Sequence, residues 1–136
     1  MFQIYRYCSD MKRILFLVVI TGLTLISCNK LDGEVKMKVG ETTSNEDISL
    51  KFVDYSDSRC PEGTTCISAG HVTVWMEMQS DTATRNFAIG NEESPYEIQF
   101  SAMNYNVRFI DLTPHPKEGK TIKTSDVKLH LQVSKL

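Results

Sequence analysis

The chain is poor in the residue types that mark several protein classes. Its 136 residues include only seven glycines and four prolines, which excludes a collagen-like or low-complexity chain. Neither sign of charge dominates, since 15 Lys and Arg stand against 17 Asp and Glu, so we expect no nucleic-acid partner. A hydrophobic content of 41% is too high for a disordered chain. The length allows one domain.

Motifs that indicate catalysis or metal binding are also missing. The sequence has no GxSxG nucleophile turn, no HExxH helix, no P-loop and no GxGxxG motif. His71, His115 and His130 are widely separated, whereas a structural zinc site takes four ligands, so we expect no metal ion and no cofactor. A non-enzymatic protein is therefore favoured, and an envelope enzyme with an unrecognised site is kept as an alternative.

The one long apolar run lies near the start of the chain. It extends over Ile14–Ile26 and directly follows the basic pair Lys12 and Arg13. A membrane-spanning helix needs about 20 apolar residues, so this shorter run is typical of the central region of a signal peptide. The run ends in the residues Leu-Ile-Ser-Cys, the last of which is Cys28, and polar residues follow at once.

This combination resembles the lipobox of bacterial lipoproteins. The resemblance implies that residues 1–27 are a cleaved signal peptide and that Cys28 receives the lipid, with translation starting either at Met1 or at Met11. It also implies a location in the bacterial cell envelope, anchored to a membrane through acyl chains. Asn29, where an inner-membrane protein would have Asp, favours the outer membrane. An ordinary secretory signal or an uncleaved membrane anchor are the alternatives.

Beyond the signal, apolar and polar residues alternate with a period of two, as they do in half-buried strands. We expect a lipidated tether over residues 28–34 and an all-β domain over residues 35–136. The pattern predicts a small antiparallel β-sandwich or barrel of about seven strands. After Phe109 the apolar positions change phase to Ile110 and Leu112, which predicts a β-bulge or a strand buried on both faces. The alternating segments are 35–39, 48–52, 72–78, 87–89, 96–100, 105–109 and 127–133.

Besides the lipid-bearing Cys28, two cysteines remain after signal cleavage, Cys60 and Cys66, and they flank a segment that contains proline and glycine. Disulfides persist outside the cytoplasm, so we predict a bridge between them, worth roughly 2 to 2.5 kcal/mol in the chain-entropy view. The alternatives are a redox motif, zinc ligation, and a rigid loop headed by Arg59 that blocks a protease cleft.

The segment around these cysteines resembles a group of small bacterial secreted or lipid-anchored domains with the core D-S-R-C-P-x-x-x-x-C-x-x-x-G. Here that core runs over residues 57–70, followed by a later stretch at 107–116 and a final strand at 126–133. Many members have Trp where this chain has Ser68. The resemblance implies a compact β domain and supports the disulfide, and it implies no reaction.

Three residues are candidates for contact with an unknown protein or small molecule: Arg59, Trp75 and His115. Trp75 is the only tryptophan. It lies on the face of its segment opposite the apolar residues, so it either packs against a second layer or anchors a ligand. His115 lies between two prolines, in a stiff connection or a recognition loop. We therefore expect a membrane-anchored binding or structural module, with a protease-inhibitor-like module as the alternative.

Lipid attachment is directly testable. Cells grown on radiolabelled palmitate should label the wild-type protein, and Cys28→Ser should abolish the label because only the thiol accepts the diacylglyceryl group. Cys8→Ser is the matched control and should keep the label. Full labelling of Cys28→Ser would refute the lipobox assignment.

Overall fold

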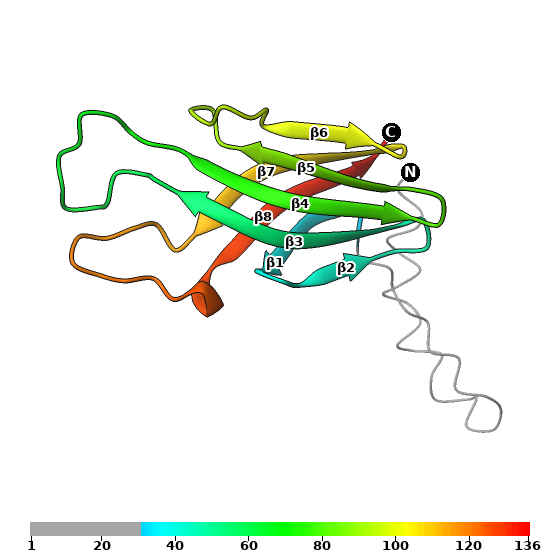
Figure 1. Ribbon diagram of the computed structural model, residues 1–136, viewed down its shortest axis with the longest axis horizontal. Coiled ribbons are helices and arrows are strands. Elements are labelled where there is room, and N and C mark those ends of the chain that lie inside the picture. Colours follow the sequence, from blue (N-terminus) through cyan, green and yellow to red (C-terminus); the bar gives the residue numbers. More distant parts are fainter. Residues whose placement is uncertain (1–30) are drawn as a thin grey trace, which may run out of the picture.

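The computed structural model describes residues 31–136, in which the period-two segments become strands of two layers (Figure 1). One sheet has the order β1-β8-β7-β6 and the other the order β2-β3-β4-β5, with every pairing antiparallel. The sheets stay open at their edges, so the domain is a β-sandwich and not a barrel. The strands are β1 (Gly33–Lys38), β2 (Thr42–Ser44), β3 (Ile48–Asp57), β4 (Val72–Ser80), β5 (Thr84–Gly90), β6 (Gln99–Ala102), β7 (Tyr105–Thr113) and β8 (Lys128–Lys135).

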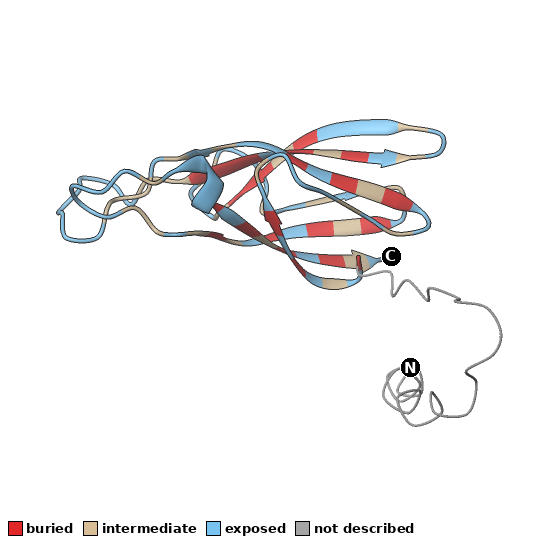
Figure 2. Cartoon of the chain, turned by 90° about the horizontal axis from the view of Figure 1, so that it is seen from below, coloured by how far each residue is buried: buried red, intermediate tan, exposed pale blue. Residues whose placement is uncertain are grey.

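The core lies between the two sheets and is formed by the inward-facing residues of the strands. Burial therefore alternates along them, as the banding in Figure 2 shows. Each fully buried Leu, Val, Phe or Met contributes about 1.5–3 kcal/mol of transfer free energy, so this layer is the main source of stability. The largest fully buried side chains are Phe52, Leu31, Met37, Leu50, Met76, Met78, Ile89, Leu112, Leu129, Leu131, Val72 and Val74.

The prediction of an all-β sandwich is confirmed, with two differences in the strands. There are eight strands where the sequence predicts about seven, because the polar strand β2 has no apolar alternation to reveal it. The segment predicted over 96–100 enters the sheet only at Gln99. Pro95 and the turn before it hold Tyr96 outside the ladder, where its backbone N–H donates to Ser94 Oγ at 3.2 Å.

The folded domain begins earlier than expected, so the tether predicted over residues 28–34 is wrong at its C-terminal end. Leu31 is fully buried, and β1 starts at Gly33, which pairs with Val133 of β8. Burial of a leucine side chain is favourable enough to draw this segment onto the core. The predicted signal peptide over residues 1–27 and the lipidation site at Cys28 lie outside the described residues. Within residues 31–136, the structure contains no helix that could span a bilayer.

Two irregularities change which side chains face outward. The bulge predicted after Phe109 is confirmed: the register of β7 against β8 shifts between Phe109 and Asp111, which leaves Ile110 exposed and returns Leu112 to the core. A second shift, which the sequence pattern did not predict, lies in β3 between Phe52 and Asp54. An extra residue in one strand is left out of the ladder and re-aims its neighbours.

The two ends of the sandwich differ in their connections. β1 enters at the end where β8 finishes, since Gly33 pairs with Val133 and Lys38 with Lys128. We call this the tether end. The long connections 58–71 and 114–123 project together from the opposite end, which we call the loop end (Figure 1, left).

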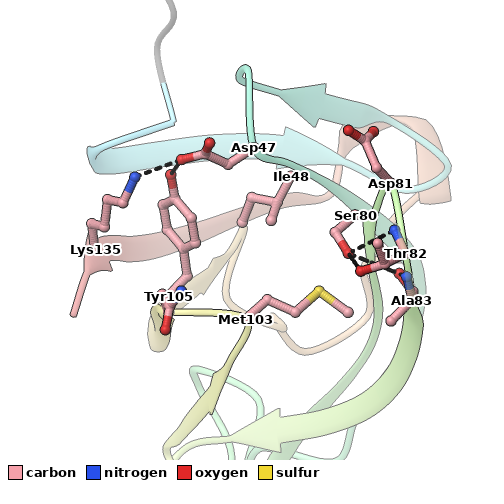
Figure 3. Close-up of a pocket in the computed structure, with 10 residues that line it drawn as sticks. Asp47, Ile48, Ser80, Asp81, Thr82, Ala83, Met103, Tyr105 and Lys135 are labelled. Atoms are coloured by element: carbon pink, nitrogen blue, oxygen red, sulfur yellow. Dashed lines mark hydrogen bonds and ion pairs between the residues drawn. The ribbon is translucent and has the colours of Figure 1, made fainter.

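At the tether end, a polar cluster joins the two sheets. The Tyr105 hydroxyl of β7 donates to Asp47 Oδ2 at 2.8 Å, and Lys135 Nζ of β8 donates to the same oxygen at 2.6 Å (Figure 3). Asn45 Nδ2 donates to the Tyr105 oxygen at 3.0 Å. The bonds from Lys135 and Tyr105 lower the pKa of the Asp47 carboxyl, and the same carboxylate raises the pKa of Lys135.

This cluster predicts a pH dependence of stability. A lowered carboxyl pKa stabilises the fold above its unfolded pKa, about 3.9, and this contribution disappears as the pH falls through the folded-state pKa. Asp47→Asn should therefore flatten the acid side of a plot of thermal midpoint against pH. Asp81→Asn, an exposed change at the same end, is the control and should follow wild type. An unchanged acid decline in Asp47→Asn would contradict this role.

Candidate functional site

The pairing register of β4 turns Trp75 away from the core. Val74 and Met76 on either side of it are buried, so the indole points to the outer face, where it is 37% exposed. Its cross-strand neighbours are Asp54 on β3 and Ala88 on β5. Ala88 has only a methyl group, so it can cover little of the indole beside it.

Trp75 lies in a shallow depression on the outer face of this sheet, which we call the aromatic hollow. Its volume is about 680 Å³, within the usual range of small-ligand sites. Three of the six exposed large apolar side chains in the described part of the chain gather here: Trp75, Val53 at 46% and Tyr96 at 45%. The hollow is lined by Val53, Asp54, Trp75, Met76, Glu77, Asn86, Phe87, Ala88 and Tyr96.

Local geometry brings Val53 and Tyr96 to this surface. Val53 follows the buried Phe52 and faces outward by ordinary alternation, and the β3 register shift turns the next residue, Asp54, outward as well. Tyr96 is placed by the turn after β5, which crosses the sheet surface. This turn is bonded to β4 through Asn91 Oδ1, which accepts from Val72 N–H at 2.9 Å, and through Ser94 Oγ, 3.0 Å from Thr73 Oγ1.

The turn approaches β4 so closely that only glycine fits at position 90. A Cβ atom there would lie 2.2 Å from the Val72 carbonyl oxygen and 2.4 Å from Ser94 Oγ. The contact thus depends on Gly90, and it fixes where the chain leaves the sheet toward Tyr96. Nothing in residues 90–96 alone indicates that the turn packs against β4. Neither Tyr96 nor Val53 is therefore predicted from the sequence as a site residue.

Polar side chains surround the apolar centre of the hollow. Glu77 lies opposite Asn86 across the β4–β5 ladder and opposite Lys51 across the β3–β4 ladder. In the described residues, neither Glu77 nor Asp54 forms an ion pair, and one Asp54 oxygen accepts the Tyr55 N–H at 2.8 Å. An exposed aromatic plane beside free hydrogen-bonding groups has the chemical make-up of a binding site.

Arg59 is used inside the protein. Its guanidinium donates twice to the Asp57 carboxylate, at 2.9 and 2.6 Å, and once to the Leu112 carbonyl at 2.7 Å. Asp111 Oδ1 lies 3.4 Å from Nη1. The Arg59 and Asp57 side chains are only 12% and 10% exposed. We call this group the arginine clamp, because it ties the start of one long connection to β7 of the other sheet.

The two long connections at the loop end lie side by side (Figure 1). The predicted Cys60–Cys66 disulfide is present, with Cα atoms 5.9 Å apart. His115 Nε2 is 3.1 Å from the Cys60 carbonyl oxygen, so the imidazole joins the two connections. The Glu62 N–H donates to the Pro116 carbonyl at 2.9 Å, and a Lys117–Glu62 ion pair at 3.1 Å lowers the Glu62 pKa.

The three candidate contact residues thus separate into two places. Arg59 and His115 stabilise the loop end. Trp75 lies on the outer face of its sheet, and among the described residues no second layer packs over it. The structure favours the exposed alternative for Trp75 over the packed one. The sequence misses Asp54, Glu77 and Asn86 as its companions, since they come from three different strands.

A second depression and possible metal ligands elsewhere are weaker candidates. The depression at the tether end, about 380 Å³, is lined by Asp47, Tyr105 and Lys135, whose polar atoms already bond to one another (Figure 3). In residues 31–136, no group of three His, Cys, Asp or Glu side chains is placed to hold a metal ion. The aromatic hollow is therefore the strongest candidate.

Comparison with known proteins adds no relative. No protein-family model, curated protein or solved structure matches this chain. The aromatic hollow is accordingly assigned from its geometry and chemistry.

The arginine clamp predicts a large stability loss on truncation. Arg59→Ala would leave the nearly buried Asp57 carboxylate without its partner, so the free energy of unfolding should fall by about 3 kcal/mol in urea denaturation. Arg108→Ala removes an exposed arginine of β7 and should stay within about 0.5 kcal/mol of wild type. Equal effects of the two changes would contradict the clamp.

Proposed function

We propose that this chain is a non-enzymatic, lipid-anchored module of the bacterial cell envelope that binds a ligand in the aromatic hollow. The observation that carries the proposal is the exposure of Trp75, Val53 and Tyr96 around one depression on an otherwise polar sheet surface. Large apolar side chains that gather on a surface mark interaction sites more often than scattered ones do.

The anchor and the hollow are compatible in space. The expected lipid attachment at Cys28 precedes the first core residue, Leu31, by three positions, and β1 begins at the tether end. The hollow faces sideways, on the outer face of the β2-β3-β4-β5 sheet. A domain attached to a membrane at its tether end would therefore leave the hollow open to solvent, as a membrane-anchored binding protein requires.

Binding without catalysis is proposed because of what lines the hollow. The lining residues include no Ser, Thr, Cys, Lys or His, so the only groups that could act as a nucleophile or as an acid or base are Asp54, Glu77 and Tyr96. The carboxylates Asp54 and Glu77 sit at an open surface. A depression of this kind suits recognition of a ligand more than sequestration of a reaction from water.

The protease-inhibitor alternative requires Arg59 to enter a pocket of the protease. The arginine clamp holds that guanidinium on Asp57 and on the Leu112 carbonyl, and these charge-assisted bonds would have to break. The geometry thus gives Arg59 a positioning role at the loop end, and we do not develop this alternative.

Because Trp75 is the only tryptophan, a single label reports on the hollow. Full-length chain carrying 5-fluorotryptophan should show one main ¹⁹F signal from the folded protein, and this signal should shift when deproteinised cell-envelope extract is added. Excess unlabelled wild-type chain should reverse the shift, and so should Ile110→Ala, a change on the outer face of the other sheet. Unlabelled Trp75→Ala should not reverse it.

A ¹⁹F signal that no envelope fraction moves would overturn the proposed binding function. Reversal by Trp75→Ala as effective as that by wild type would place the binding elsewhere on the domain.

A further inference from the structure

The size of the aromatic hollow limits what it can bind. A stable protein–protein interface uses about 20–30 residues on each side, whereas nine residues line the hollow. Its volume of about 680 Å³ instead suits a small molecule or a few units of a linear polymer. The hollow is open to solvent along the sheet surface, so a longer ligand could extend beyond it at either side.

The apolar part of the hollow offers a flat aromatic surface. The faces of aromatic rings carry negative electrostatic potential, which attracts the weakly positive C–H groups of an aliphatic ring. A pyranose ring with its C–H groups on one face has this character. Trp75 and Tyr96 are both partly exposed and both line the hollow, so two aromatic rings are available for such contacts.

The polar part of the hollow supplies hydrogen-bonding groups in the combination that hydroxyls need. Carboxylates accept only, and a carboxamide both donates and accepts. Glu77 and Asn86 are cross-strand partners, so their side chains project from the same face beside Trp75, with Asp54 on the far side of the indole. Adjacent hydroxyls of a sugar can donate to a carboxylate and accept from the amide.

The charge of the rim discriminates among ligands. Asp54 and Glu77 form no ion pair in the described residues, and Lys51 is the one cationic residue directly across a ladder from them, so an anionic ligand would meet two carboxylates and one nearby ammonium group. Recognition of a quaternary ammonium ion uses aromatic rings that surround the cation. Only Trp75 and Tyr96 offer exposed rings here, in an open depression, so a neutral ligand fits better than a cationic one.

From these features we infer that the ligand of the aromatic hollow is a neutral glycan, one sugar ring of which stacks on Trp75 while its hydroxyls bond to Glu77, Asn86 and Asp54. This inference rests on the proposed binding function and names its ligand class. Trp75 would supply most of the affinity, because few residues dominate a small binding site. Glu77 would select hydroxyl-bearing neutral sugars.

The test uses full-length chain purified in a detergent without a sugar head group. Neutral oligosaccharides of glucose, mannose, galactose and N-acetylglucosamine are titrated against the intrinsic fluorescence of the single tryptophan, with oligogalacturonate, choline and a lysine-rich peptide as competing classes. At least one neutral saccharide should change the emission saturably, with a Kd of about 1 mM or tighter. The acidic oligosaccharide and choline should give no saturable change.

Variants are compared by calorimetry with the best saccharide. Trp75→Ala should weaken binding at least about tenfold, and Glu77→Gln should weaken it while retaining the shape of the site. Ile110→Ala, an exposed apolar residue on the other sheet, should bind as wild type. Circular dichroism verifies that each variant is folded, and Trp75→Phe, which keeps an aromatic ring, should retain part of the affinity if Trp75→Ala fails to fold.

The outcomes separate the ligand class from the binding function. A Trp75-dependent response to choline, to the peptide or to the acidic oligosaccharide, without one to a neutral saccharide, overturns the glycan assignment and preserves the hollow as a binding site. No neutral saccharide response at about 10 mM also overturns the glycan assignment. A ¹⁹F signal that no envelope extract moves removes the binding function as well.

Discussion

The burial of one face of each sheet against the other is the constraint on which the rest of this structure depends. In a strand, successive side chains point to opposite faces, so burying Val74 and Met76 of β4 forces Trp75 outward. A shift of one residue in the register would exchange the two sets, at the cost of several buried side chains. The exposure of Trp75 is thus maintained by the stability of the whole core.

Departures from regular pairing shape the surface that this constraint leaves. The β3 register shift turns Asp54 outward beside Val53, and the close contact at Gly90 sends the chain across the sheet toward Tyr96. The loop end is stabilised separately by the disulfide, the arginine clamp and the His115 contact with the Cys60 carbonyl. At the hollow itself, the Gly90 contact and the Ser94–Thr73 hydrogen bond hold the turn that leads to Tyr96 in place before a ligand arrives, which reduces the entropic cost of association.

The sequence predicts the layered fold well because its information is local. Period-two alternation indicates the strands, the phase change after Phe109 indicates a bulge, and two nearby cysteines in a chain that we expect outside the cytoplasm indicate a disulfide. The site depends on contacts between distant positions, and these carry no local pattern. Arg59 bonds to the carbonyl of Leu112, 53 residues away, and so a residue that looks free for a partner is occupied within the chain.

The same limit applies to the hollow itself. Trp75 stands out in the sequence as the only tryptophan, but its companions are identifiable only from pairing across the ladders. By the period-two pattern Asp54 would face inward, so its place beside Trp75 is known only from the register shift. Leu31 illustrates the opposite error: a single apolar residue in a polar stretch is easily assigned to a tether, although it is fully buried.

The outward orientation of Trp75 is tested most directly by acrylamide quenching of its fluorescence in the native full-length chain, compared with the chain unfolded in urea. An indole that is 37% exposed should emit between the wavelengths of a buried indole and of the urea-unfolded chain, and acrylamide should quench it measurably in the native state. A blue-shifted emission that resists acrylamide would place Trp75 inside the core. It would contradict both the register of β4 and the site built on it.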